Sequence, residues 1–269
     1  MSRAQAVRVA VTLLLGSAIA SCAPHVIAPP RLEPGSIADR FRIARAARAA
    51  LAGAVDAEVS AWLRGDSLGD LPGVHARLAL GAPDAFRVRV GSMFGVALDF
   101  AAWGESLACF VPSRKLGVAL DAAGDDLAVR SPGPLGVRVL AATWDPPASA
   151  WERAEFEDSL LVVRWAEAGD SLALGVGSSG LPRRFAMKDA KGSKVEARYL
   201  GWEFVERTPW PVRMEFEDHA AGLLLMLRLT RITRNPRPAP DRLVVRIPPD
   251  AARLEWSALR RALSRTRGM

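Results

Sequence analysis

The stretch that decides the fold is V-H-A-R-L-A-L at residues 74–80, followed after the turn Gly81-Ala82-Pro83-Asp84 by F-R-V-R-V at residues 86–90. In both runs apolar residues alternate with other residues, which is the period of a strand with one buried face. The pattern returns at residues 96–100, 107–111 and 116–120, with turn-forming residues in between. This spacing predicts an antiparallel meander.

Outward from this meander the same period continues towards the C-terminus. The later strand-like runs are residues 161–165, 172–174, 185–187, 195–204, 212–216, 223–232 and 243–247. Residues 134–143 interrupt them with a helix-compatible start at Pro134 and a stop before Pro146-Pro147. We therefore predict about ten strands in one strongly curved sheet, with a helix inserted midway.

A second helix is predicted ahead of the first strand. Ile37, Phe41, Arg48 and Leu51 recur at helical spacing on an alanine-rich segment, and Ser36 is placed to act as the N-cap. The predicted helix covers residues 37–52, and residues 249–265 are expected to form a short helix and a basic tail. The fold class is mainly β (α+β): a curved antiparallel half-barrel with an N-terminal and an inserted helix covering an apolar cavity.

Composition limits the classes of function. The chain has 269 residues, of which 50% are hydrophobic and 24% charged, so it can bury a large core. The net charge of +7 comes almost wholly from arginine, because only Lys115, Lys188, Lys191 and Lys194 are lysines. No zinc spacing, RNA-binding aromatic motif or helix-turn-helix accompanies it, so we expect no nucleic-acid partner and no cofactor or metal.

The N-terminus predicts the compartment. Arg3 and Arg8 precede a short apolar run, the layout of a signal peptide over residues 1–21. Ile19-Ala20-Ser21-Cys22 then resembles the bacterial lipobox, which implies cleavage before Cys22 and lipidation of that residue. The alternative is an ordinary secreted protein with a chance cysteine. Residues 22–36 are proline-rich and predict a tether. Ala23, in a place where aspartate retains lipoproteins at the inner membrane, favours the outer membrane.

This order of elements resembles the lipoprotein-sorting family, LolA and LolB. The match covers residues 37–255 and leaves residues 256–269 as the basic tail. It implies a half-open barrel that encloses acyl chains of lipoproteins in an apolar cavity. With Cys22 lipidated, Cys109 has no disulfide partner and is predicted to be a small core residue rather than a reactive thiol.

One local string carries the resemblance to LolB furthest. In that branch an early strand ends in a Pro-Leu-Gly turn, whose leucine protrudes and is tied to delivery of cargo to the membrane. Met93, Phe94 and Gly95 stand in that place, although the proline is absent. The resemblance implies that Phe94 protrudes. The alternative is that Phe94 packs in the core as an ordinary hairpin residue.

A one-sheet protein with few helices leaves part of its apolar face for a ligand, and each buried CH₂ of an acyl chain contributes about 0.8 kcal/mol. The candidate cavity-lining residues are apolar positions of the predicted strands, for each of which plain core packing is the alternative. They are Trp62, Leu78, Phe86, Val88, Phe100, Leu161, Trp165, Phe185, Trp202, Phe204, Met214, Phe216 and Leu227.

Three strings resemble enzyme motifs but lack their context. Residues 175–180, G-V-G-S-S-G, fit a dinucleotide-binding pattern, yet Leu181-Pro182 follows where a helix must begin. Gly-Asp-Ser-Leu occurs at residues 65–68 and 169–172, as in the GDSL esterases, but no histidine lies three residues after an aspartate. These strings predict turns.

Two charged segments have alternative interpretations. The segment from Glu215 to His219 could hold a cation, yet its alternation with apolar residues favours a solvated strand face. The arginines of residues 231–237 and 260–267 are typical of solvated surface, with contact to anionic head groups as the alternative. No catalytic or metal site is expected.

The sequence thus predicts a periplasm-facing, outer-membrane lipoprotein that binds acyl chains or lipidated protein and takes part in lipoprotein localisation without catalysis. Its expected partners are the inner leaflet of the outer membrane, reached through the lipid anchor, and a periplasmic carrier protein. The alternative is an envelope sensor or scaffold that uses the same fold to bind a protein partner.

Overall fold

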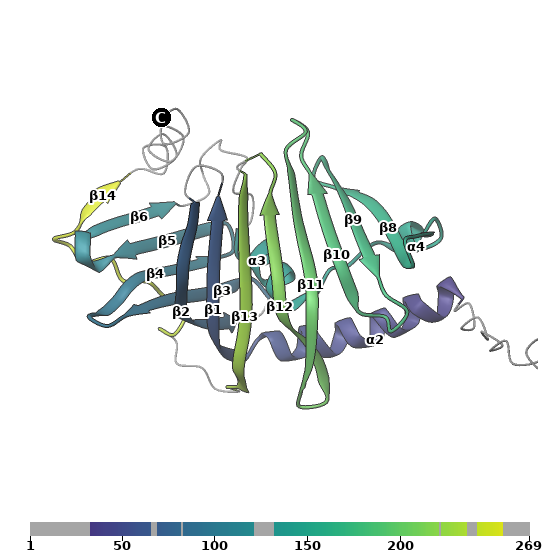
Figure 1. Ribbon diagram of the computed structural model, residues 1–269, viewed down its shortest axis with the longest axis horizontal. Coiled ribbons are helices and arrows are strands. Elements are labelled where there is room, and N and C mark those ends of the chain that lie inside the picture. The colour runs from purple at the N-terminus through teal and green to yellow at the C-terminus, as the bar shows by residue number, and fades with distance from the viewer. Residues whose placement is uncertain are drawn as a thin grey trace, which may run out of the picture. The chain divides into compact units, whose positions relative to one another are not determined.

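In the described part of the chain, all but one of the alternating runs lie in a curved, open sheet of 14 strands (Figure 1). The computed structural model describes residues 33–65, 69–81, 83–120, 132–220, 222–235 and 241–254, and residues 34–269 form a unit of their own. The signal peptide, Cys22, nearly all of the tether and the basic tail lie outside the described residues. The strands are β1 (Val55–Gly65), β2 (Gly69–Gly81), β3 (Ala85–Ser92), β4 (Gly95–Trp103), β5 (Ser106–Val111), β6 (Leu116–Leu120), β7 (Glu155–Glu157), β8 (Leu160–Glu167), β9 (Asp170–Val176), β10 (Pro182–Lys188), β11 (Lys194–Val205), β12 (Thr208–Asp218), β13 (Leu223–Arg234) and β14 (Ala252–Leu254).

The sheet consists of two meanders that meet at β1 and β13. Its order is β14-β6-β5-β4-β3-β2-β1-β13-β12-β11-β10-β9-β8-β7. All neighbours are antiparallel except β14, which pairs parallel with β6. The expectation of about ten antiparallel strands is therefore corrected. Strands of three residues, such as β7 and β14, are too short to show an alternating pattern in the sequence.

The helices of the described residues are α2 (Pro34–Ala52), α3 (Pro132–Ala141) and α4 (Ala148–Trp151), with a short 3₁₀ turn η1 (Pro112–Arg114). The predicted face of α2 is confirmed, because Ile37, Phe41, Arg48 and Leu51 are buried. The N-cap prediction at Ser36 is wrong, since the helix already begins at Pro34, and proline suits a first helical turn. The inserted helix begins and ends two residues earlier than predicted. Among the described residues no helix is long and apolar enough to cross a membrane.

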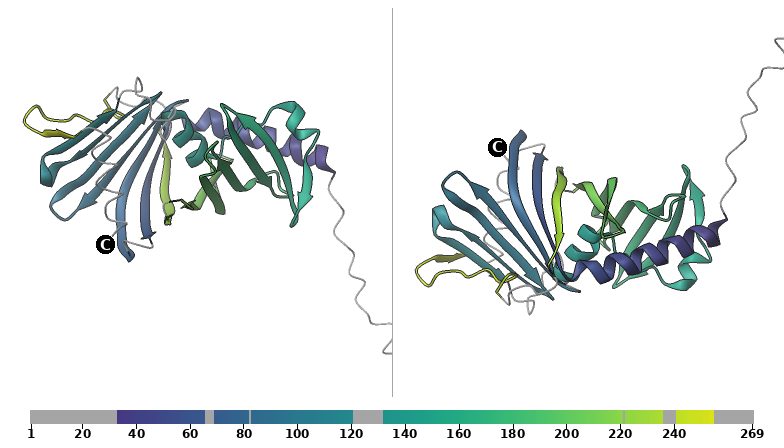
Figure 2. Two further views of the ribbon diagram at one scale, coloured as in Figure 1. Left: turned by 90° about the horizontal axis from the view of Figure 1, so that it is seen from above. Right: turned by 90° about the horizontal axis from the view of Figure 1, so that it is seen from below.

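The helices lie on one side of the sheet, which we call the helix side (Figure 2). The ring of Phe41 on α2 lies 5.0 Å from that of Trp151 on α4. On α3, Gly136 lies against the ring of Phe86 from β3. The main core of the protein lies between these helices and the sheet.

Residues 241–251, which we call the closing segment, cross the opposite side, the outer side. Leu243 lies against Gly81, Val245 packs on Ala101 and Ala108, and Ile247 lies against Gly117. The predicted strand at residues 243–247 is wrong, because these residues join no ladder. Their alternation arises because every second side chain packs down onto the sheet. The helix predicted from residue 249 is also wrong where it is described, since residues 252–254 form β14.

Candidate functional site

Register places most of the candidate cavity-lining residues together on the helix side. Cross-strand partners share a face, and Leu78 pairs with Val88, Val88 with Phe100, and Met214 with Leu227. The residues divide by burial into two groups. The buried group is Leu78, Leu161, Trp165, Phe185 and Met214, and the half-buried group is Phe86, Val88, Phe100, Trp202, Phe216 and Leu227.

Side chains fill the part of the helix side that lies under the helices. The rings of Trp144 and Phe185 stack with centroids 3.4 Å apart. The Nε1–H of Trp144 donates to the Tyr199 hydroxyl at 2.9 Å, which donates in turn to the carbonyl of Val139 at 2.9 Å. Burial raises the pKa of Tyr199 well above its ordinary value, so this hydroxyl stays protonated. We call this filled region the covered core.

A buried arginine ties α2 to the end of α3. Arg48 donates from Nε and Nη2 to the carbonyl of Ala142 at 3.2 and 3.0 Å, and its guanidinium lies 5.1 Å from the centre of the Trp202 ring. Burial lowers its pKa to about 10, so the group remains charged at neutral pH. The sequence placed Arg48 on the apolar stripe of the helix, and that position is the signal that it is buried.

Beyond the covered core the helix side becomes an open apolar surface. Here apolar side chains of neighbouring strands are only half-buried, and their registers are continuous from β12 through β13 to β1 and from β3 to β4. Several were not among the sequence candidates, although their alternation with Val88 and Leu227 is the signal that finds them. The open apolar surface consists of Leu63, Val88, Val90, Leu98, Phe100, Phe216, Leu225 and Leu227.

Two sequence candidates lie away from this surface. Trp62 pairs with Met226 on the outer side and lies over Gly73. Its neighbours along β1, Ala61 and Leu63, face the helix side, so alternation turns Trp62 outwards. Phe204 is 78% exposed near the end of β11. In Figure 1 the hairpin of β11 and β12 extends past α2, which explains why the helix does not cover it.

The hairpin between β3 and β4 carries the predicted delivery residues. Met93 and Phe94 are 88% and 93% exposed, so the alternative that Phe94 packs in the core is wrong. Ser92 fixes the turn: its Oγ donates to the carbonyl of Gly95 at 3.1 Å and accepts from the N–H of Phe94 at 3.2 Å. Gly95 has a φ of +114°, which a residue with a side chain rarely adopts. The turn thus holds two large apolar side chains in solvent.

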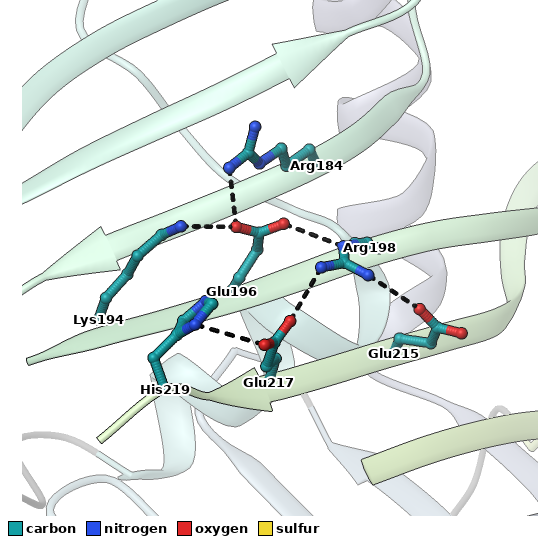
Figure 3. A network of polar contacts seen from close by, with 7 residues as sticks. All are labelled: Arg184, Lys194, Glu196, Arg198, Glu215, Glu217 and His219. Carbon is teal, nitrogen blue, oxygen red and sulfur yellow. Dashed lines mark hydrogen bonds and ion pairs between the residues drawn. The ribbon is translucent and has the colours of Figure 1, made fainter. Parts of the chain in front are cut away.

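The outer side of β10–β12 carries a network of ion pairs (Figure 3). Arg198 bridges Glu196 at 3.0 Å, Glu215 at 3.4 Å and Glu217 at 2.8 Å. Burial alone would raise the pKa of Glu196, but hydrogen bonds from Lys194, Arg184 and Arg198 outweigh it and lower the pKa to about 2. These partners support the interpretation of this strand as a solvated charged face, and within the described part of the chain no cluster could hold a metal ion.

The strings that resemble enzyme motifs lie in hairpins where the structure describes them. Gly175 and Val176 end β9, and the N–H of Gly177 donates to the carbonyl of Leu181 at 3.0 Å, so a strand and not a helix follows. Gly169 has a φ of +90° in the turn between β8 and β9. In the other string, residues 66–68 lie outside the described residues.

Two adjoining hollows open on the outer side of the sheet. They have volumes of about 610 and 540 Å³ and share Glu58, Arg77 and Arg89 in their walls. Most of the residues that line them are charged or polar. Arg87 at one end binds Asp99 through two bonds of 2.7 and 2.6 Å. These hollows therefore differ from the apolar cavity that was expected under the helices. The side chains of the covered core fill the place of that cavity.

Comparison with known proteins gives similarity in fold alone. No family model matches the chain, and no curated protein matches its sequence. Among solved structures, a LolA superfamily protein from Nitrosomonas europaea has a TM-score of 0.53 at 14% identity, covering 80% of this chain and 98% of that one. A domain from Vibrio parahaemolyticus, whose name refers to outer membrane lipoprotein sorting, has a TM-score of 0.47 at 10% identity, covering 78% and 96%.

A DUF1329 family protein from Desulfovibrio piger has a TM-score of 0.46 at 8% identity, covering 79% of this chain and 98% of that one. Two chains of such low identity share an arrangement of strands and helices and little else. The superposition on the LolA superfamily protein covers four fifths of this chain and nearly all of that one. The chain therefore has the LolA-like fold that its sequence resemblance predicts.

Proposed function

We propose that this chain is an outer-membrane lipoprotein, anchored through Cys22 and facing the periplasm. It binds the acyl chains of lipoproteins or lipids on the open apolar surface and takes part in lipoprotein localisation without catalysis. The observation that carries the proposal is the open apolar surface itself. Apolar side chains that continue a core yet stay half-exposed are typical of ligand and partner sites.

An acyl chain suits this surface better than a polar ligand does. Its wall is built of aliphatic and aromatic side chains from the sheet, such as Leu98, Phe100 and Leu227. Each CH₂ moved from water into such surroundings contributes about 0.8 kcal/mol, so a long chain is held without any charged group. The covered core already fills the rest of the helix side, so a ligand would lie over the open strands.

The exposed hairpin between β3 and β4 is the part of the protein that would contact the membrane when cargo is delivered. An aromatic side chain held in solvent loses the free energy of burial unless it meets an apolar partner, and the interior of a membrane is such a partner. Phe94 therefore enters the outer membrane while cargo leaves the apolar surface. The fold shared with a LolA superfamily protein supports this role.

Native mass spectrometry tests the binding of acyl chains. The soluble chain from residue 23, purified without detergent, is expected to carry lipid, and Leu98→Glu with Leu227→Glu is expected to lose it. Phe156→Glu is the matched control, because Phe156 is 48% exposed on β7, at the far edge of the sheet. A folded protein that carries no lipid but captures a protein partner would favour the sensor or scaffold alternative.

Metabolic labelling with a fatty acid tests the anchor separately. The full chain is expected to incorporate label, and Cys22→Ala is expected to lose it because no other residue supplies the acylated thiol after the lipobox. Cys109→Ala is the control and should keep the label. Equal labelling of the full chain and of Cys22→Ala would contradict lipidation at Cys22.

A further inference from the structure

On the outer side of the sheet, β2, β13 and β12 each carry an arginine that binds no carboxylate of the described residues. Arg228 on β13 pairs in the ladder with Arg213 on β12, and Arg77 on β2 pairs with Arg89 on β3. Among the described residues no carboxylate binds Arg77, Arg213 or Arg228. Arg89 reaches Asp99 at 3.4 Å, but Arg87 already binds that carboxylate through two shorter bonds.

The carboxylates of this region are occupied by other arginines. Glu58 binds Arg231 at 2.9 Å, and Asp56 binds Arg242, which also donates to the carbonyl of Leu80 at 3.0 Å. On β10–β12, by contrast, Arg198 is matched by three glutamates (Figure 3). The two parts of the outer side therefore differ: one is neutralised by its own side chains, and the other keeps an excess of positive charge.

Two of the arginines on the outer side, Arg77 and Arg89, line hollows that are open to solvent. Arg77 and Arg89 belong to the walls of both the 610 Å³ and the 540 Å³ hollow. Ser60, His75 and Thr230 add hydroxyl and imidazole groups to the second one. Arginine with neighbouring hydroxyl groups is the donor set that binds phosphate oxygens.

The distance to the hairpin suggests where such phosphates would come from. Arg89 lies three residues before Ser92, which is roughly 10 Å along a strand at about 3.3 Å per residue. A side chain that enters the apolar layer of a membrane lies about that far from the lipid phosphates, since an interfacial anchor is buried by ~5–10 Å. Phe94 in the apolar layer would therefore bring Arg89 close to the head groups.

We propose that Arg77, Arg89 and Arg228 form a head-group surface that binds the phosphates of an anionic phospholipid membrane while Met93 and Phe94 enter its apolar layer. The proposal rests on the membrane-delivery role of the hairpin and adds its lipid preference. Positive side chains near an anionic surface attract it over a Debye length, so the contact weakens with salt. The surface also orients the protein, because these three arginines lie on the same side of the sheet.

Vesicle co-sedimentation of the soluble chain from residue 23 tests the proposal. Vesicles of phosphatidylcholine are compared with vesicles that also contain phosphatidylglycerol. Arg77→Gln, Arg89→Gln and Arg228→Gln are combined, and each is expected to weaken binding about fivefold, so that together they weaken binding to the anionic vesicles about 100-fold. The control combines Arg153→Gln, Lys191→Gln and Arg207→Gln, exposed cations away from the hairpin, and should bind like the unchanged protein.

Several outcomes would overturn the proposal. It fails if the combined arginine variant keeps its preference for phosphatidylglycerol, or if the control weakens binding as much. It also fails if inorganic phosphate displaces the vesicles better than chloride does at equal ionic strength, because the arginines would then form a site for free phosphate.

Binding of a fluorescent fatty acid separates this result from the proposed function. The arginine variant should keep that binding, because its changes lie on the outer side of the sheet. If the unchanged protein does not bind the fatty acid, that result counts against the proposed function. The vesicle experiment would still decide whether the arginines bind an anionic membrane.

Discussion

Two regions on the helix side of the sheet both carry apolar side chains, but one region is buried and the other is partly exposed. In the covered core, Trp144 is fully buried and Phe185 is 2% exposed, with their rings stacked. On the open apolar surface, Leu98 and Phe100 are half-buried, and the hairpin beside them exposes Phe94. Alternation in the sequence sets which side of the sheet a residue faces. The helices decide whether that residue supports the fold or remains available to a ligand.

Removing an aromatic ring from the covered core should have the largest effect on stability. Trp144→Ala deletes a buried ring and leaves Tyr199 without its donor, so the free energy of unfolding should fall by about 3–5 kcal/mol. Denaturant unfolding followed by circular dichroism measures the change. Trp103→Ala, at an exposed tryptophan of β4, is the control, with a change of about 0.5 kcal/mol or less. Equal losses in both variants would remove the distinction between the two regions.

A change on the open apolar surface should lower the free energy of unfolding less than a change in the covered core does. It should also weaken the binding of fatty acid. Phe100→Ala removes a half-buried ring, so unfolding should become easier by about 1–2 kcal/mol, less than for full burial. Affinity for a fluorescent fatty acid should fall several-fold in the same variant. Phe156→Ala at the far edge of the sheet should leave that affinity unchanged. If Phe100→Ala destabilises the protein as much as Trp144→Ala and leaves affinity intact, the open surface is part of the core.

The ion-pair network on the outer side predicts a smaller, pH-dependent effect. The pKa of Glu196 in the folded protein is lowered to about 2, below the ordinary value of 4.5. At pH values above 4.5 the carboxylate therefore contributes its full stabilisation. That contribution is lost as pH falls from about 4.5 towards 2. Glu196→Gln should lose stability at neutral pH and approach the unchanged protein in acid. A stability difference that stays constant over this range would contradict the role of the network.

The smallest effect on stability is expected at the exposed hairpin. Phe94→Glu should change the free energy of unfolding by about 0.5 kcal/mol or less, because the ring makes no core contact. Transfer of a fluorescent lipid to liposomes should nevertheless be lost, since a carboxylate does not enter the apolar layer. Phe204→Glu, at another exposed hairpin, should keep the transfer. Loss of lipid transfer in both variants would contradict a delivery role that is specific to the hairpin between β3 and β4.

The sequence predicted the meander, both longer helices and the buried stripe of α2, because period and spacing report directly on which side a residue faces. It could not predict how Phe94 lies, since a turn of the same sequence can fold its ring inwards or outwards. Trp62 was misplaced for a different reason: it is out of phase with Val59 and Leu63, which face the helix side, so the alternation within β1 turns it outwards. The closing segment was predicted as a strand because alternation looks the same whether a segment pairs at an edge or packs on a face.

The candidate site was only partly accessible from the sequence. Apolar positions were identified, but their division between the covered core and the open apolar surface depends on where α2 and α3 lie, which is a tertiary property. The unpartnered arginines on the outer side were equally hidden. Arg77 and Arg228 stand between apolar residues of a strand, as the paired Arg87 does. The cross-strand register shows which carboxylates lie near each of them.

Photo-crosslinking of an acyl chain tests the central claim most directly. The soluble chain from residue 23 is incubated with a fatty acid that carries a photoreactive diazirine, irradiated and mapped by peptide mass spectrometry. The open apolar surface predicts labels in residues 86–100 and 223–227, and their loss when unlabelled fatty acid competes. Labels confined to peptides that contain Trp144 or Phe185, or labelling that unlabelled fatty acid does not reduce, would contradict acyl-chain binding on this surface.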